Sequence, residues 1–198
     1  MGVISKYRLE KLYIKKGLSA KEAGKVFGCS ENKVNYWIRK HNIPKRTVSE
    51  AIYVQRNPGG DPFAMRKLHT RQEMFLYGLG LGLYWGEGTK SNTNSVRLGN
   101  TDPKLIKTFL KFLKLCFQID ENKLRFGLQV FSDMNPNRAL HFWVKELGLK
   151  QSQFQKVIVT PARSIGTYRQ KTQHGVLTVY FNNKKLRNLI VGEIEKMQ

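Results

Sequence analysis

Residues 75–88 read FLYGLGLGLYWGEG, and this glycine-rich stretch decides the architecture that we expect for the larger part of the chain. Gly78, Gly82 and Gly86 recur every four residues, so on a helix they would form one stripe without side chains. Glycine inside a helix costs about 0.5–1 kcal/mol relative to alanine, so three of them need a structural reason. A bare stripe lets a second helix approach until the backbones nearly touch. The stretch therefore predicts a helix that packs closely on another helix.

The end of this stretch resembles the LAGLIDADG motif of homing endonucleases, whose nine positions are matched by GLGLYWGEG at residues 80–88. Glu87 falls on the acidic position, which in that family binds the catalytic divalent metal. The sequence departs from the motif in its leading Gly80, in Trp85, and in having Glu where Asp is commoner. The resemblance covers roughly residues 75–198 and implies Mg²⁺- or Mn²⁺-dependent hydrolysis of phosphodiesters.

The resemblance also implies a homodimer, because that family packs two such helices across a two-fold axis and this chain contains one motif. Two Glu87 carboxylates, one from each subunit, would then hold Mg²⁺ with the scissile phosphates and waters. Lys90 and Lys156 are candidates to stabilise the transition state, with simple phosphate contact as the alternative role. The alternative for Gly78, Gly82 and Gly86 is packing against a neighbouring helix of the same chain. No small-molecule substrate is expected.

Strands and helices alternate after the glycine helix, which predicts an α/β (α+β) domain over residues 71–198. This order is compatible with the saddle-like antiparallel sheet of the LAGLIDADG family. The expected strands are residues 95–100, 124–131, 156–160 and 176–182. Three of them alternate apolar residues with polar ones and contain no acid, which is typical of a sheet face that contacts DNA. An ordinary solvated face is the alternative. The predicted DNA contacts on this face are Arg97, Arg125, Gln129, Thr178, Tyr180 and Asn182.

The first part of the chain, residues 1–46, predicts three short helices. Ser19 and Glu22 form a capping box at the start of the second, and Ser30 caps the third, which runs to His41. Helix, glycine turn, helix is the helix-turn-helix arrangement, and residues 17–46 resemble its resolvase- and regulator-type version. We expect the third helix to enter the major groove of DNA, with a protein-contact module as the alternative. The predicted contacts are Asn32, Lys33, Asn35, Tyr36, Arg39, Lys40, Lys45 and Arg46.

Residues 47–70 predict a loosely packed linker, because the hydrophobic periodicity fades there and residues 57–62 read NPGGDP. The net charge of +21 belongs to both sides of this linker. Residues 1–70 carry 15 basic and 5 acidic side chains, and residues 71–198 carry 20 and 9. Such a surface favours an acidic polymer as the partner, with a ribosome-type basic protein as the plainer alternative.

Other classes of protein fit the sequence less well. The four histidines are scattered and, with Cys29 and Cys116, form neither a zinc spacing nor a Ser-His-Asp arrangement. The glycine-rich stretch lacks the Gly-Lys-Ser/Thr ending of a P-loop. The apolar stretch from Met74 to Trp85 is far shorter than the ~20 residues of a membrane-spanning helix. The first residues contain no apolar run, so we expect no signal peptide and a cytoplasmic, nucleoid-associated protein.

Together these features predict a homodimer that binds specific sites in double-stranded DNA and cleaves them with Mg²⁺. The alternative is a catalytically inactive transcriptional regulator built on the same LAGLIDADG fold, since Glu87 favours a nuclease whereas the added helix-turn-helix favours a regulator. RNA binding of the maturase kind is the remaining possibility.

Overall fold

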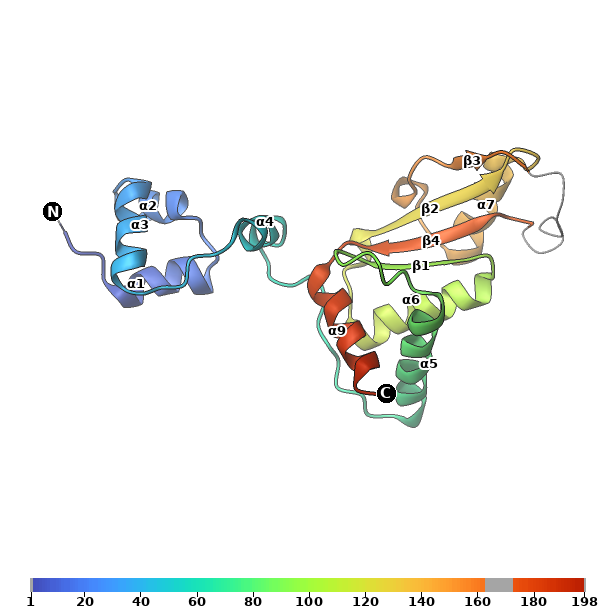
Figure 1. Ribbon diagram of the computed structural model, residues 1–198, viewed down its shortest axis with the longest axis horizontal. Helices are drawn as coiled ribbons and strands as arrows, with labels where there is room; N and C mark the ends of the chain where they lie inside the picture. Colours follow the sequence, from blue (N-terminus) through green and yellow to red (C-terminus); the bar gives the residue numbers. More distant parts are fainter. Residues whose placement is uncertain (1, 163–172, 198) are drawn as a thin grey trace. The chain divides into compact units, whose positions relative to one another are not determined.

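The computed structural model describes residues 2–162 and 173–197. The chain divides into two compact units, Met1–Pro62 and Phe63–Gln198, which are labelled by element in Figure 1. Each unit has its own cluster of buried apolar side chains, so each is described by itself.

The segment predicted as a linker contributes to both units. Its first half contains a nine-residue helix, α4 (Val48–Arg56), which begins with a capping box at Thr47. Its second half is held to the second unit, because Ala64 N and Arg66 N donate to the carbonyl oxygens of Phe117 and Cys116, both at 2.9 Å. The breaker-rich residues 57–62 therefore end the first unit, while the residues on either side are folded.

The first unit consists of short helices around a small apolar core. They are α1 (Lys6–Glu10), the π-helical turn η1 (Lys11–Lys15), α2 (Ala20–Phe27), α3 (Glu31–Lys40) and α4. The predicted N-terminal caps at Ser19 and Ser30 are confirmed by their hydrogen bonds. Ser19 Oγ accepts from Glu22 N at 3.1 Å, while Ser19 N donates to the Glu22 carboxylate at 2.7 Å. Ser30 Oγ accepts from Lys33 N at 3.3 Å. The buried side chains of this core are Ile4, Leu9, Tyr13, Ala23, Val34, Trp37, Ile38 and Ile43.

In the second unit, the strands of the described residues form one four-stranded sheet in the order β1-β4-β2-β3. The strands are β1 (Val96–Asn100), β2 (Leu124–Phe131), β3 (Ile158–Thr160) and β4 (Val176–Phe181). The prediction of an antiparallel sheet is wrong at one pair. β4 runs antiparallel to β1 and β2, but β3 runs parallel to β2. The chain leaves β2 through a helix before it returns as β3, and a crossover of this kind brings the returning strand back in the same direction.

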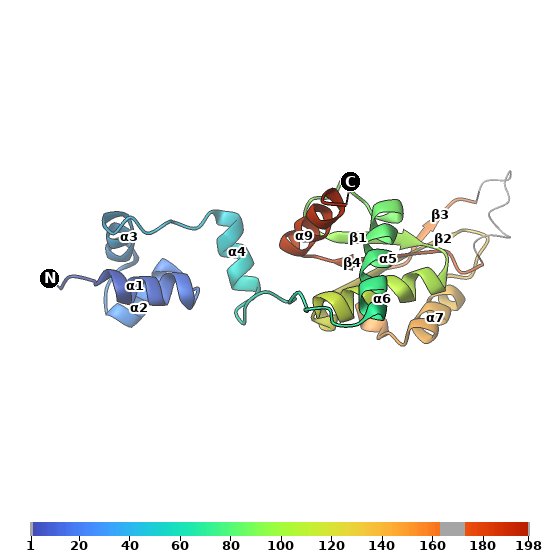
Figure 2. The same cartoon turned by 90° about the horizontal axis from the view of Figure 1, so that it is seen from below.

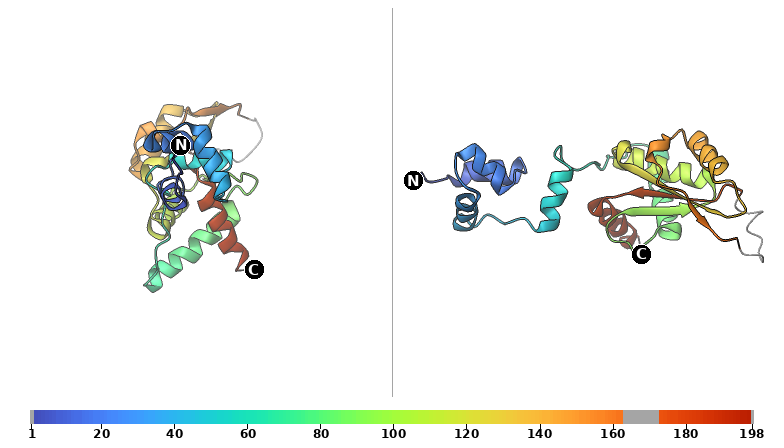
Figure 3. Two further views of the ribbon diagram at one scale, coloured as in Figure 1. Left: turned by 90° about the vertical axis from the view of Figure 1, so that its left-hand side faces the viewer. Right: turned by 90° about the horizontal axis from the view of Figure 1, so that it is seen from above.

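Helices cover one face of this sheet, and the described residues leave the other face open. They are α5 (Arg71–Glu87), α6 (Pro103–Phe117), α7 (Pro136–Leu147) and α9 (Lys184–Glu195), with 3₁₀ turns η2 (Glu121–Lys123) and η3 (Gln151–Gln153) between elements. Figure 2 shows these helices in front of the sheet, and the right-hand view of Figure 3 shows the strands in front of the helices. The predicted alternation is confirmed, since the strand residues facing the helices are buried.

The glycines of α5 differ in what lies beside them within the chain. Gly80 makes the close contact within the chain, because a Cβ added there would overlap the ring of Phe112 on α6. A Cβ at Gly78, Gly82 or Gly86 would meet nothing within 4 Å. The spacing-four stripe is therefore not used for helix packing among the described residues, and the alternative that it packs on a neighbouring helix of the same chain is wrong there.

Candidate nucleic-acid interface

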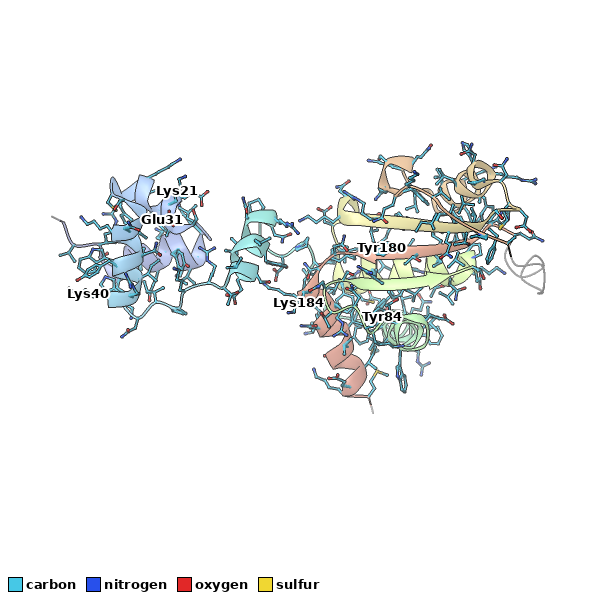
Figure 4. The ribbon with its side chains drawn as sticks, turned by 45° about the horizontal axis from the view of Figure 1, so that its top comes forward. Lys21, Glu31, Lys40, Tyr84, Tyr180 and Lys184 are labelled. Atoms are coloured by element: carbon cyan, nitrogen blue, oxygen red, sulfur yellow. The ribbon has the colours of Figure 1, made fainter. Side chains whose placement is uncertain are left out.

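The polar face of the sheet is organised in rows across three strands. Arg97 on β1, Tyr180 on β4 and Arg125 on β2 are register partners, so they form one row with the tyrosine between two arginines. Figure 4 labels Tyr180 on this open face. The Arg97 guanidinium lies 5.2 Å from the centre of the Tyr180 ring, which fits a cation–π contact. The sequence predicted these residues for one face, but only the pairing of β1 and β2 with β4 brings them side by side.

Two glycines in the next row leave room for the larger side chains. Gly99, Thr178 and Gly127 are register partners across the same strands. A Cβ at Gly127 would lie 3.0 Å from the Tyr180 ring, and one at Gly99 would lie 3.0 Å from Thr178 Oγ1. Neither glycine could be recognised as a site residue from the sequence, because its role depends on the neighbouring strand. The two glycines therefore allow the Tyr180 ring and the Thr178 hydroxyl to lie close to the backbone of the neighbouring strands.

The two arginines are steadied by short hydrogen bonds near the ends of their strands. Arg97 Nε donates to Ser95 Oγ at 2.8 Å, and Arg125 Nη1 donates to the carbonyl oxygens of Asn122 and Leu124 at 2.6 and 2.8 Å. A guanidinium has five N–H donors, and these bonds use one nitrogen of each side chain. Both groups are therefore oriented while keeping donors for a ligand.

The remaining predicted contacts of the sheet lie along the same surface. Gln129 is exposed on β2 and pairs in register with Val176, one row beyond Thr178. Asn182 is exposed just after β4. The described strands contain no Asp or Glu, so the face carries no acid of its own.

The residues after the glycine helix are held against the edge of the sheet. Gly88 forms an isolated antiparallel β-bridge with Leu98, and Thr89 N donates to Arg97 O at 2.9 Å. Arg187 of α9 donates from Nη2 to Lys90 O at 2.8 Å. The Arg187 guanidinium also faces Tyr84, where it opposes the burial that raises the pKa of the phenol. Arg187 thus fixes the segment that follows Glu87, a role that the sequence analysis missed because α9 lies far along the chain.

The predicted catalytic residues are not gathered within one chain. Glu87 is exposed at the end of α5, and the Lys90 ammonium turns back to donate to Trp85 O at the same helix end. Lys156 is exposed just before β3, whereas Glu87 adjoins β1. β1 and β3 are the opposite edges of the sheet, about 14 Å apart at the usual strand spacing. Lys90 therefore lies near Glu87, and Lys156 does not share a site with it in the same chain.

The stripe side of α5 presents an apolar surface. Phe75 and Trp85 are 71% and 54% exposed, and Met74 and Leu79 are exposed as well. With Gly78, Gly82 and Gly86 they form what we call the glycine face. Among residues 2–162 and 173–197, no three His, Cys, Asp or Glu side chains gather as a metal site. A Mg²⁺ site at Glu87 would therefore need ligands from elsewhere, and Mg²⁺ is commonly held by one or two carboxylates together with substrate phosphates.

In the first unit, α3 presents the predicted contacts away from the core. Asn32, Tyr36, Arg39 and Lys40 are exposed, as is Lys45, while Lys33 and Asn35 are half-buried. The Lys40 ammonium lies 4.8 Å from the centre of the Trp37 ring, so the indole helps to position this cation. The exposed side of α3 is polar and basic, as the sequence predicted.

Arg46 differs from the other predicted contacts, because its guanidinium is used inside the first unit. Nη1 donates to Gly17 O at 2.8 Å, and Nη2 donates to Tyr13 O at 3.3 Å and to Leu18 O. The guanidinium carbon lies 4.2 Å from the centre of the Tyr13 ring. Tyr13 lies within η1, and Gly17 and Leu18 follow its end, where a cation is electrostatically favoured. Arg46 therefore anchors the chain that leads into α4, and we leave it out of the candidate interface.

Comparison of the chain with known protein families, curated proteins and solved structures found no match. In the part of the chain that the structure describes, none of the helices combines the length and the apolar character that crossing a bilayer requires.

Proposed function

We propose that this protein binds specific sites in double-stranded DNA through α3 of the first unit and the open sheet face of the second. The observation that carries the proposal is the row of Arg97, Tyr180 and Arg125 on a sheet face whose described strands contain no acid. Arginine donates two hydrogen bonds to guanine or pairs with phosphate, and Gln, Thr and Tyr add contacts to base edges and backbone. The basic excess on both units supports the same partner. Such a protein would be associated with the DNA of the cell.

The test is selection of bound molecules from a random pool of double-stranded DNA, followed by affinity measurement on the selected site. Arg97→Ala and Arg125→Ala are expected to weaken binding, each by about tenfold, if each loses a good base contact. Lys111→Ala is the matched control, because it removes one exposed cation from α6 on the helix side of the sheet. The affinity of the wild type should fall roughly 10³-fold between 50 and 200 mM salt if six or more phosphates are neutralised. Equal affinities for all three variants, or selection of structured RNA in a parallel pool, would refute the proposal.

Mg²⁺-dependent cleavage by a homodimer is the second candidate function. The observation that favours it is the exposed glycine face of α5, which ends beside the exposed Glu87. Two copies joined through this face would supply one carboxylate each, and the phosphates of the DNA would complete the coordination of Mg²⁺ or Mn²⁺. The metal would supply an activated water and neutralise charge on the leaving oxygen. Lys90, at the same end of α5, would then contact phosphate.

Cleavage is tested on the selected site with Mg²⁺ and with Mn²⁺, and binding is measured in Ca²⁺. Glu87→Gln should abolish cutting while leaving the affinity in Ca²⁺ nearly unchanged, because the variant keeps the shape of the side chain and loses only its charge. Cutting that persists undiminished in Glu87→Gln would refute the metal-ligand role. If the wild type binds its site tightly and never cuts it, the protein acts as a DNA-binding regulator.

A further inference from the structure

Among the described residues of the first unit, α4 is the helix that contributes no buried side chain. Its apolar residues Val48 and Ile52 are 79% and 42% exposed. Both line a cleft of about 780 Å³ within this unit. A helix that only connected two units would not need exposed apolar side chains along a cleft. Such side chains indicate a binding surface, so α4 has a surface that is suited to a ligand.

The position of α4 is set by contacts at its two ends. Arg46, directly before the helix, is bound by the carbonyl groups of Tyr13, Gly17 and Leu18. Val54 near the other end packs on the turn after η1, since a Cβ at Gly17 would lie 2.8 Å from Val54 Cγ1. The helix is therefore held beside the module formed by η1, α2 and α3, with its Val48 and Ile52 edge left open.

The opposite wall of the cleft belongs to the candidate DNA-reading helices. It includes the first turn of α2 and, on α3, Glu31 and the predicted base contact Asn35. Figure 4 places Lys21 and Glu31 at one end of the helical module and Lys40 at the other. The lysines that line the cleft are Lys16, Lys21, Lys25 and Lys45. Of the two acids, Glu22 is engaged by the backbone of Ser19. The cleft therefore combines a cationic lining with an apolar edge, which suits a sugar–phosphate strand and the groove beside it.

We propose that α4 is a second DNA-contacting element of the first unit, which enters the minor groove next to the major groove occupied by α3. One sugar–phosphate strand then lies in the cleft between the two helices, with its charge neutralised by the four lysines. Val48 and Ile52 meet the floor of the minor groove. This inference rests on the proposed binding of DNA by α3.

The dimensions of DNA imply that binding of α4 in the minor groove deforms the duplex. The minor groove of B-DNA is about 6 Å wide, whereas a helix with its side chains is about 10 Å across. α4 can therefore enter only if the groove widens. Apolar side chains in the minor groove partly unstack a base step and kink the duplex toward the major groove. The wild type is accordingly expected to bend its site.

The experiment compares Val48→Ser/Ile52→Ser with Val26→Ser on the full chain. Val26 is also an exposed valine, on α2, and it is absent from the cleft lining, so it controls for loss of apolar surface. All three side chains are exposed, so the variants should fold.

Affinity is measured on the selected site, and bending is measured by energy transfer between dyes at the two ends of the duplex. The double variant should bind about tenfold more weakly and lose the bend, while Val26→Ser matches the wild type. A minor-groove-binding dye should displace the wild type more readily than the double variant.

The outcomes separate this inference from the proposed function. If the wild type binds no DNA, both are refuted. If the wild type binds DNA but the double variant bends it equally and competes equally with the dye, only the role of α4 is refuted. If sedimentation without DNA shows a dimer that the double variant loses, a second copy of the chain occupies the α4 edge and the inference is likewise overturned.

Discussion

The two sides of α5 both carry glycine, for opposite reasons. Gly80 is buried and leaves room for the Phe112 ring, so it joins α5 to α6. Gly78, Gly82 and Gly86 lie on the other side, where an added Cβ would meet no described atom within 4 Å beyond the neighbouring backbone of α5 itself. The comparison shows that a regular glycine spacing identifies a bare surface but does not say what covers it. In this helix the single glycine outside the spacing makes the internal contact.

The largest effect is expected on the buried side. Gly80→Val should destabilise the second unit by about 3 kcal/mol or more, because α5 and α6 cannot accommodate the new side chain without moving apart. Urea unfolding followed by tryptophan fluorescence measures the change, since Trp143 is part of this core. Gly82→Ala is the control on the other side, and in the monomer it should leave stability unchanged or raise it by about 0.5–1 kcal/mol, the usual gain of alanine in a helix. Equal losses of stability in the two variants would show that the two sides of α5 do not differ in their packing.

The next effect concerns assembly through the glycine face. Gly82→Leu should convert the proposed dimer into a monomer, because the bulky side chain separates two helices that would otherwise touch. Light scattering at tens of micromolar protein, with and without DNA, gives the mass. Lys111→Ala, outside the glycine face, should leave the mass unchanged. A wild type that stays monomeric under both conditions would contradict the dimer.

The acidic residues of α5 extend the comparison to its two ends. At the first turn, Glu73 accepts from His69 N and Thr70 N at 2.9 and 3.1 Å and pairs with Arg66 at 2.9 Å. Backbone hydrogen bonds from His69 and Thr70, with the nearby Arg66, lower the pKa of the Glu73 carboxyl from 4.5. A carboxyl with a lowered pKa stabilises the fold at pH above its unfolded value and ceases to do so as pH falls through its folded value.

The free energy of unfolding should therefore decrease as pH falls below about 4.5, and Glu73→Gln should reduce that dependence. Thermal unfolding of both proteins from pH 3 to pH 7 provides the measurement. Glu193, whose pKa is also lowered, would retain part of the slope in the variant. A variant with the same pH profile as the wild type would show that the Glu73 cap does not contribute.

The smallest effect is expected at the other end of α5. Glu87 has no hydrogen bond or ion pair within the described residues, and it lies where the helix dipole disfavours a negative charge. Glu87→Gln should raise the stability of the protein without metal by about 0.3–1 kcal/mol, although it should abolish cutting if the protein is a nuclease. Calorimetry at low ionic strength resolves the difference. A loss of about 1 kcal/mol would instead identify Glu87 as a structural hydrogen-bond acceptor.

Local features of the fold could be predicted because the interactions that create them join neighbours in sequence. The predicted capping box at Ser19 joins residues three positions apart. The alternation along β2 reflects the two faces of any strand, and its burial pattern follows the predicted one at every residue. The prediction was less successful at α4, where weak periodicity concealed a capped helix. It also failed at β3, because the direction of a strand depends on the route by which the chain returns to the sheet.

By itself, the sequence determined the basic charge of both units, the glycine stripe, the polar alternation of the strands and most helix starts. Only the tertiary structure decided which of these features meet. It placed Tyr180 between Arg97 and Arg125, turned Arg46 into an internal anchor and set Lys156 at the sheet edge opposite Glu87. The physical reason is that charge, capping and side-chain alternation are properties of a short segment. A site is a property of the distances between segments, which are set by packing and strand pairing over the whole unit.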